Sequence, residues 1–157
     1  MGKVLNKNEL ASVVEEIKKQ NKKIVFTNGC FDILHIGHVR YLKESARFGD
    51  ILMIGLNSDN SVQRLKGPTR PINNENDRAE LLCELNFVDY VVIFDEQTPE
   101  NLLNEIKPSI YTKGADYTLE TLPEAAVVMS NGGKVEFINL VEGKSTTNVI
   151  KKIEENK

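Results

Sequence analysis

The sequence predicts an α/β fold in which a mostly parallel, five-stranded sheet carries helices on both faces. Short apolar runs alternate along the chain with amphipathic segments of helical spacing, the pattern of strands joined by crossover helices. An apolar share of 40% beside a charged share of 27% is typical of a globular protein. At 157 residues the chain has the length of one domain, and no internal repeat or low-complexity linker divides it.

The first half of the chain is predicted to begin with an amphipathic helix at 9–20, because its apolar residues recur at helical spacing. The apolar run at 22–29 is typical of a buried strand. A helix is expected at 37–49, where Gly49 can end it, and the next strand is expected at 50–59. The two histidines therefore lie between the first strand and its helix.

The second half continues the alternation after a polar stretch at 63–76, which is predicted to be a loop because it contains prolines and glycine. Thr98 is expected to cap a later helix, with Pro99 at its first position. The elements predicted after the loop are a helix at 77–87, a strand at 88–95, a helix at 98–108, a strand and loop at 109–118, a helix at 123–133, a strand at 134–140 and a helix at 145–156.

Charge and cysteine content narrow the classes of function. A net charge of −3 gives no general attraction to nucleic acid or to an anionic membrane. No apolar segment reaches transmembrane length, and the amphipathic start does not have a signal-peptide pattern. Cys30 and Cys83 form no disulfide framework and are expected to be small, semi-buried apolar side chains. We expect a cytoplasmic protein without nucleic-acid or membrane partners, and the sequence leaves a homodimer open.

Three polar clusters follow predicted strands: "GCFDILHIGH" at 29–38, "YTKGAD" at 111–116 and "EGKSTT" at 142–147. Open α/β sheets bind ligands outside the carboxyl ends of their strands, where the loops lead into helices. We therefore expect these three clusters to meet at one edge of the sheet and to form the binding site.

The first cluster holds both histidines of the chain, His35 and His38, on either side of Gly37. Gly37 allows a ligand to approach the backbone, and His38 lies in the first helical turn, where free amides and positive potential favour an anion. The pair is predicted to bind a phosphate and to stabilise a leaving group. Two alternatives stay open: structural histidines that cap the turn, and a zinc site with Cys30, for which no fourth ligand is obvious.

In the other clusters, Ser145 or Thr146 can cap the last helix, whose free amides could meet a second phosphate. Lys113 adds a point charge, and Asp116 could hold a ribose hydroxyl or a magnesium-bound water. Lys66 would by default be a surface charge, although the glycine and proline that follow it indicate a loop shaped to close over a ligand.

"GCFDILHIGHVRYL" together with "KSTTNVI" resembles the nucleotidyltransferase superfamily, which has a His-x-Gly-His signature and a late Ser-Thr-Thr signature. The resemblance extends from about residue 22 onward, through "NSDNSVQRLKGPTRPI", "DRAELL" and "KGADYT". It is closest to the adenylyltransferase domain that acts on heptose 1-phosphate in ADP-heptose synthesis, here without the sugar kinase to which that domain is often fused. It implies a single Rossmann-like domain at 1–157, with an N-terminal helix at 1–21 and a catalytic core at 22–157.

The resemblance implies transfer of AMP from ATP to a sugar phosphate, most closely D-glycero-D-manno-heptose 1-phosphate, with Mg²⁺ accompanying ATP and with pyrophosphate released. It assigns catalysis to His35, His38 and Lys66. It assigns nucleotide binding to Thr27, Asn28, Gly29, Phe31, Gly37, Lys113, Gly114, Asp116, Ser145, Thr146 and Thr147. Arg70 and Arg78 are expected to bind the acceptor, and no protein metal ligand is expected.

The chain departs from the glycerol-phosphate cytidylyltransferase relatives. Those typically carry a tryptophan before the loop lysine and an Arg-Thr pair before the late signature, whereas this chain has no Trp and contains "NLVEGKSTT". The departure favours ATP over CTP. Two alternatives remain, a cytidylyltransferase that makes CDP-glycerol and a non-catalytic nucleotide-binding regulatory domain, and the presence of both histidines and Lys113 argues against the second.

Overall fold

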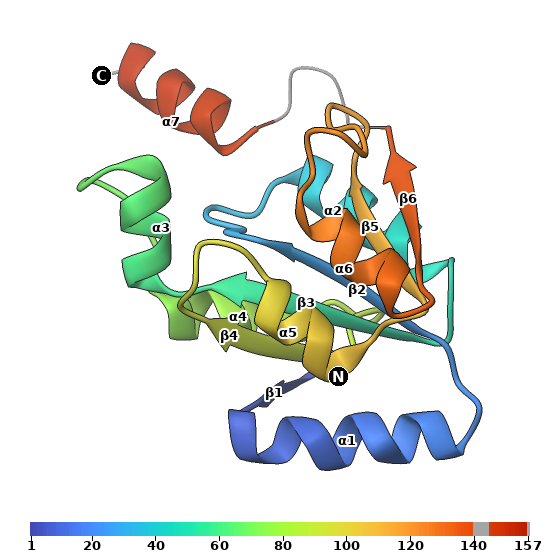
Figure 1. Ribbon diagram of the computed structural model, residues 1–157. Helices are drawn as coiled ribbons and strands as arrows, with labels where there is room; N and C mark the ends of the chain where they lie inside the picture. Colours follow the sequence, from blue (N-terminus) through green and yellow to red (C-terminus); the bar gives the residue numbers. More distant parts are fainter. Residues whose placement is uncertain (140–144, 157) are drawn as a thin grey trace.

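The computed structural model describes residues 1–139 and 145–156 and contains one parallel sheet covered by helices (Figure 1). The strands lie in the order β1-β4-β3-β2-β5-β6. They are β1 (Lys3–Leu5), β2 (Ile24–Gly29), β3 (Ile51–Asn57), β4 (Tyr90–Phe94), β5 (Ile110–Gly114) and β6 (Lys134–Ile138). The helices are α1 (Lys7–Lys19), α2 (Ile36–Ala46), α3 (Asp59–Lys66), α4 (Glu75–Cys83), α5 (Glu100–Ile106), α6 (Glu124–Ser130) and α7 (Thr146–Glu155).

The predicted α/β class and the parallel sheet are confirmed, but the sheet has one strand more than the five predicted. The additional strand is β1, which pairs with β4 from Lys3↔Tyr90 to Leu5↔Val92. It lies within the segment 1–21, for which only a helix was expected. Asn6 ends this strand and starts α1, because its side chain accepts from the backbone N–H of Glu9 in a capping box.

Three local predictions were wrong. The helix α2 ends at Ala46 with Arg47 at the cap position, so Gly49 does not end it. The stretch at 63–76 does not begin as a loop, because α3 continues to Lys66 and is capped by the hydroxyl of Ser58. The helix α5 starts one residue later than predicted, with Pro99 at the cap position and no side-chain capping hydrogen bond, so Thr98 does not cap it.

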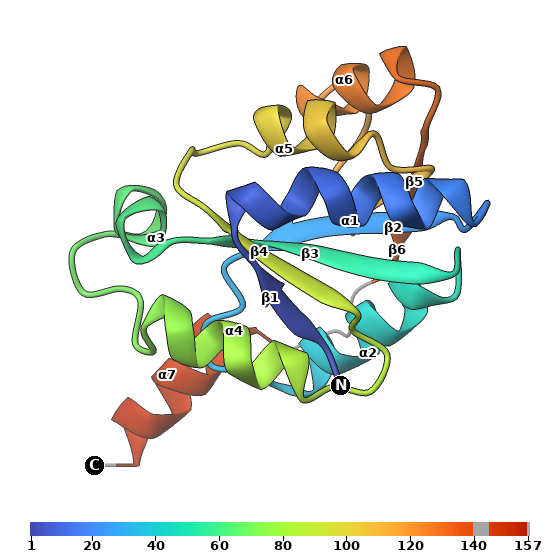
Figure 2. The same cartoon turned by 90° about the horizontal axis from the view of Figure 1, so that it is seen from below.

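Helices cover both faces of the sheet, as predicted. Figure 2 shows α1, α5 and α6 on one face and α2 and α4 on the other. Each face has its own apolar cluster. On the first, Leu10 of α1 and Leu103 of α5 pack with Phe26, and on the second, Leu42 of α2 and Leu82 of α4 pack with Ile54. Burial on both faces explains why β2 begins with the apolar run Ile24–Phe26 and why β3 is apolar along most of its length.

The order in which strands are added to the sheet changes direction at β2. The next strand in the sequence, β3, pairs with β2 on one side, and β5 pairs with β2 on the other. The pair Phe26↔Tyr111 sets the register between β2 and β5. Their carboxyl ends, at Gly29 and Gly114, therefore lead into neighbouring loops at a topological switch point, the usual ligand position in such sheets. Among the described helices, none is long and apolar enough to cross a membrane.

Candidate functional site

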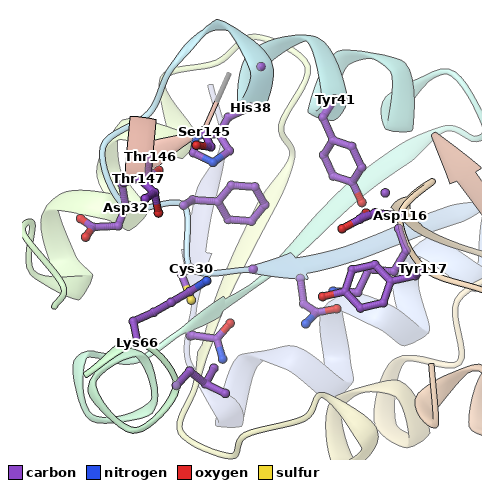
Figure 3. Close-up of a pocket in the computed structure, with 18 of the residues that line it drawn as sticks. Cys30, Asp32, His38, Tyr41, Lys66, Asp116, Tyr117, Ser145, Thr146 and Thr147 are labelled. Carbon is purple, nitrogen blue, oxygen red and sulfur yellow. The ribbon is translucent and has the colours of Figure 1, made fainter. Parts of the chain in front are cut away.

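A cavity of about 590 Å³ opens at the carboxyl ends of the strands, where the first two polar clusters meet residues 145–147 of the third (Figure 3). Residues 142–144 of the third cluster lie outside the described residues. All predicted site residues line it except Thr27 and Arg78. Residues that line it without having been predicted are Cys30, Asp32, Tyr41, Asn57, Leu65, Gln97, Thr98, Pro99, Tyr117 and Glu124. Figure 3 shows His38 beside Ser145–Thr147 at one end of the cavity and Asp116 beside Tyr117 at the other.

His35 and His38 stack on each other at the start of α2, with ring centroids 3.8 Å apart and ring planes 24° apart. His35 is the N-cap residue, and its Nδ1 accepts from the N–H of Gly37 at 3.1 Å. His38 Nδ1 accepts from the N–H of His35 at 3.3 Å. The edge of the Phe31 ring approaches His38, with centroids 5.4 Å apart. The turn therefore fixes both rings, and His35 caps the helix as the structural alternative expects, while the contact with a phosphate stays a prediction.

The protonation of His38 follows from this geometry. Burial removes the imidazolium from water and His35 repels it, so the pKa of His38 falls from 6.5 to about 4, although Asp32 opposes the change. His38 is therefore neutral at pH 7 in this structure. Because Nδ1 accepts a backbone hydrogen bond, the single ring proton is on Nε2, which makes that atom a hydrogen-bond donor.

Asp32 joins the first cluster to the loop after α3. Its carboxylate is buried and accepts from the N–H groups of Ile72 at 2.7 Å and Asn73 at 3.0 Å, and from Arg70 Nε at 2.9 Å. Burial alone would raise the pKa of Asp32, but these hydrogen bonds outweigh it and the pKa is lowered. Arg70 is thereby held at the cavity with its Nε engaged by Asp32.

The late signature also contacts the first cluster. The hydroxyl of Thr146 donates to the backbone carbonyl of Asp32, and it lies 3.4 Å from that of Ile33. Ser145 caps α7, because its hydroxyl accepts from the N–H of Asn148 at 3.0 Å. Thr147 is exposed and lines the cavity. The three hydroxyls predicted to bind phosphate thus differ in their local contacts. Those of Ser145 and Thr146 form hydrogen bonds within the protein, and none is described for that of Thr147.

In the part of the chain that the structure describes, three cationic side chains line the cavity, Lys66, Arg70 and Lys113. Lys66 is the last residue of α3, and in Figure 3 its side chain points toward Cys30. Lys113 lies on β5 with its Nζ 5.1 Å from the centre of the Tyr117 ring. Burial lowers the pKa of Lys113, although the charge of Glu124 opposes this. A cationic cavity of this kind favours an anionic ligand.

Arg78 and Thr27 lie behind the cavity wall. The side chain of Arg78 is fully buried and donates to the carbonyls of Asn73, Cys30 and Asn57 at 2.7–2.9 Å, and to Asp59 Oδ1 at 2.9 Å. Arg78 thus cross-links the loops around it and does not line the cavity, so its contact with the acceptor stays a prediction that this geometry does not support. The buried hydroxyl of Thr27 donates to the carbonyl of Thr112 at 3.1 Å and lies 2.8 Å from that of Tyr41.

Two of the cavity residues that were not predicted could have been found from the sequence. Asp32 stands inside the first cluster, and Tyr41 lies one turn after His38 on the same helix face. Glu124 carried no comparable signal.

Among the described residues, no group of three His, Cys, Asp or Glu side chains is placed to hold a metal ion, so the zinc alternative has no geometric support there. Burial raises the pKa of Cys30, which keeps its thiol protonated.

Comparison with known proteins matches residues 26–152 to the cytidylyltransferase-like family. Bifunctional protein HldE from Geobacter metallireducens is 53% identical over 151 residues, which are 96% of this chain and 31% of that protein. Bifunctional protein HldE from Campylobacter concisus is 56% identical over 146 residues, which are 92% of this chain and 30% of that protein. The chain thus spans about a third of the length of these relatives.

Among solved structures, a lipopolysaccharide core biosynthesis protein from Thermoplasma volcanium is 34% identical, with a TM-score of 0.63. The match covers 76% of this chain and 97% of that one. The matched segment, residues 26–152, includes both histidines, Lys66, Lys113 and the late Ser-Thr-Thr, which are the residues that surround the cavity. The chain therefore belongs to the cytidylyltransferase-like family.

Proposed function

We propose that this chain is a nucleotidyltransferase that transfers AMP from ATP to a sugar phosphate, most closely D-glycero-D-manno-heptose 1-phosphate, and releases pyrophosphate. One observation carries the proposal. The histidine turn, the start of α7 and three cationic side chains converge on a single cavity at the switch point of the sheet. Membership of the cytidylyltransferase-like family supports the reaction type, and the sugar acceptor is supported by the sequence resemblance.

In the proposed reaction, a phosphate oxygen of the acceptor attacks the α-phosphorus of ATP, and the bond from that phosphorus to the bridging oxygen breaks. The chain then needs to position two anions and stabilise charge, and it needs no nucleophile of its own. We assign His38 Nε2–H to the α-phosphate and leaving oxygen, with His35 as its stacked partner. Lys66 and Arg70 are assigned to the acceptor phosphate.

The nucleotide side of the cavity is proposed to include Asn28, Gly29, Phe31, Gly37, Lys113, Gly114, Asp116, Ser145 and Thr147. Mg²⁺ is proposed to enter with ATP as the metal complex of the triphosphate oxygens, which such hard cations prefer. Thr146 is proposed to act by joining α7 to the carbonyl of Asp32.

The test measures pyrophosphate release with ATP, CTP, GTP and UTP against a panel of sugar and polyol phosphates. We expect the highest kcat/KM for ATP with the heptose 1-phosphate. Replacement of His38 by Ala should lower turnover by about two to four orders of magnitude with an unchanged circular dichroism spectrum. A higher kcat/KM for CTP with glycerol 3-phosphate would instead identify a CDP-glycerol enzyme. Nucleotide binding without turnover on any acceptor would identify a regulatory domain.

A further inference from the structure

Asp32 connects three parts of the chain at the edge of the cavity. Its side chain is fully buried, and the carboxylate accepts from Arg70 Nε at 2.9 Å and from the N–H groups of Ile72 at 2.7 Å and Asn73 at 3.0 Å. Its backbone carbonyl accepts from the hydroxyl of Thr146. Figure 3 shows Asp32 beside Thr146 at one end of the cavity. One residue thus joins the first cluster to the start of α7 and to the loop between α3 and α4.

The backbone on both sides of Asp32 has a conformation that few residues adopt. Phe31 and Ile33 have φ values of 45° and 52°, in the left-handed region. Such values are uncommon for residues other than glycine, and a β-branched residue such as Ile33 is strained there. Backbone strain persists where the surrounding contacts hold it, and it is concentrated at ligand sites. The strain therefore indicates that the position of Asp32 matters for a ligand as well as for the fold.

The guanidinium of Arg70 has donors left over after it binds Asp32. An arginine side chain has five N–H donors, one on Nε and two on each terminal nitrogen. In the described part of the chain, the hydrogen bond from Nε to Asp32 is the only one that this side chain forms. The side chain is 13% exposed and lines the cavity. Its terminal N–H groups are therefore available to a ligand, and their fork matches two oxygens of one phosphate.

The contribution of Asp32 to this arrangement is direction. Although burial alone would raise it, the pKa of Asp32 is lowered by its hydrogen bonds, so the carboxylate is charged at neutral pH. Its charge offsets part of the attraction that Arg70 has for an anion. In return, a bond at Nε restricts the turning of a planar guanidinium on a flexible side chain, and binding then costs less ordering of that side chain.

We propose that Asp32 is a positioning residue that holds Arg70 at Nε so that the terminal N–H groups of the guanidinium bind the acceptor phosphate end on. The inference rests on the proposed function, because it concerns how the acceptor of that reaction is held. Arg70 contacts the ligand, and Asp32 acts through Arg70. A side-on contact would need Nε together with one terminal nitrogen, and Asp32 already occupies Nε. The ligand chemistry that remains is a phosphate monoester bound through two of its oxygens.

The first experiment measures the KM for ATP and the KM for the acceptor that gives the highest kcat/KM. The proteins are the wild-type chain, Asp32→Asn, Arg70→Lys and the variant with both changes. Asp32→Asn replaces an accepting oxygen with an NH₂ group, and Arg70→Lys keeps the charge but removes the fork. Asp89→Asn is the matched control. Asp89 Oδ2 also accepts from a backbone N–H, that of Leu52 at 2.8 Å, and Asp89 does not line the cavity.

Asp32→Asn should raise the KM for the acceptor about tenfold and the KM for ATP less than about threefold, because the fork of Arg70 loses its alignment. Arg70→Lys should raise the KM for the acceptor by a similar factor. The variant with both changes should resemble Arg70→Lys alone, because Asp32 then has no guanidinium to position and the two effects do not multiply. Asp89→Asn should keep both wild-type KM values.

A second measurement needs no turnover. The bond to Asp32 slows exchange of the Arg70 Nε–H with water, so the wild type should show this group in a proton–nitrogen correlation NMR spectrum. The signal is assigned by its absence from Arg70→Lys. It should be lost in Asp32→Asn and kept in Asp89→Asn. Inorganic phosphate, the probe, should shift the wild-type signal, because the terminal N–H groups of the same guanidinium bind it. This shift tests the proposal even if Asp32→Asn folds poorly.

Equal rises of both KM values in Asp32→Asn would overturn the inference, because a purely structural role predicts them. Effects that multiply in the variant with both changes would also overturn it. So would an Arg70 Nε–H signal that is missing from the wild type, survives Asp32→Asn or does not respond to phosphate. The expected NMR changes without pyrophosphate release on any acceptor would refute the proposed function alone. Pyrophosphate release together with any of the contrary results would refute this inference alone.

Discussion

Replacing His38 with Gln is predicted to flatten the pH dependence of stability on the acidic side of neutrality. In the folded chain the pKa of His38 is about 4, because burial and the stacked His35 disfavour the imidazolium, whereas its ordinary value is 6.5. The unfolded chain therefore binds more protons between these two values. The stability that comes from a neutral His38 is fully present above pH 6.5 and is lost as the pH falls toward 4.

The size of the effect follows from the difference between the two pKa values. A gap from 6.5 to about 4 corresponds to about 3 kcal/mol of unfolding free energy. This is a large part of the stability of a typical single domain, about 5–15 kcal/mol. The effect should therefore be visible in ordinary denaturation curves.

The assay is urea unfolding, followed by circular dichroism, at a series of pH values from neutral to pH 4. The other titrating groups are shared by the wild type and His38→Gln, so the difference between the two profiles isolates His38. We expect that difference to change by about 3 kcal/mol across the window, whatever its absolute value at neutral pH. Parallel profiles would refute the burial and repulsion assigned to His38.

Three other predictions concern the remaining parts of the site. Arg78→Met should lower the unfolding free energy by about 3 kcal/mol or more, because it leaves buried carbonyls without donors. A raised KM for the acceptor at unchanged stability would restore Arg78 as an acceptor ligand. Thr147→Val should raise the KM for ATP about tenfold, whereas Thr146→Val should mainly lower stability, since its hydroxyl donates to Asp32. Equal changes in the two substrates' KM values would contradict the role of Thr147. Chelation of divalent cations should abolish pyrophosphate release and Mg²⁺ or Mn²⁺ should restore it, and restoration by zinc alone would contradict this.

The alternation of apolar runs was enough to predict five strands, because each contains an apolar run, even the edge strand β6, in which only Ile138 is buried. The strand β1 gave no such signal. It has three residues, of which only Leu5 is buried, and it forms because β4 offers an edge to pair with. The helix α3 was not predicted because its composition is polar. Its N-terminus is capped by the hydroxyl of Ser58. Short elements that depend on distant partners are not encoded in local periodicity.

The site was predictable as far as topology determines it. Carboxyl ends of parallel strands share one edge, so three distant clusters could be expected to meet. The direction of each side chain was not predictable. Thr27 and Asn28 are neighbours on β2, yet successive side chains of a strand point to opposite faces, and only Asn28 lines the cavity. Arg78 carries the charge expected of a ligand, but the loops around it take up its donors.

The protonation of His38 in the proposed complex depends on the ligand. Raising its pKa from about 4 to about 7 requires about 4 kcal/mol. One negative charge at about 4 Å supplies about that much at an effective dielectric constant of about 20, and a triphosphate carries several charges. We therefore expect a bound triphosphate to favour the imidazolium, at the cost of the hydrogen bond that His38 Nδ1 accepts from the N–H of His35. His35 is 3.8 Å away in the same stack, so adding a second proton would meet a repulsion of similar size. We therefore expect the pair to take up at most one proton when the proposed substrate binds.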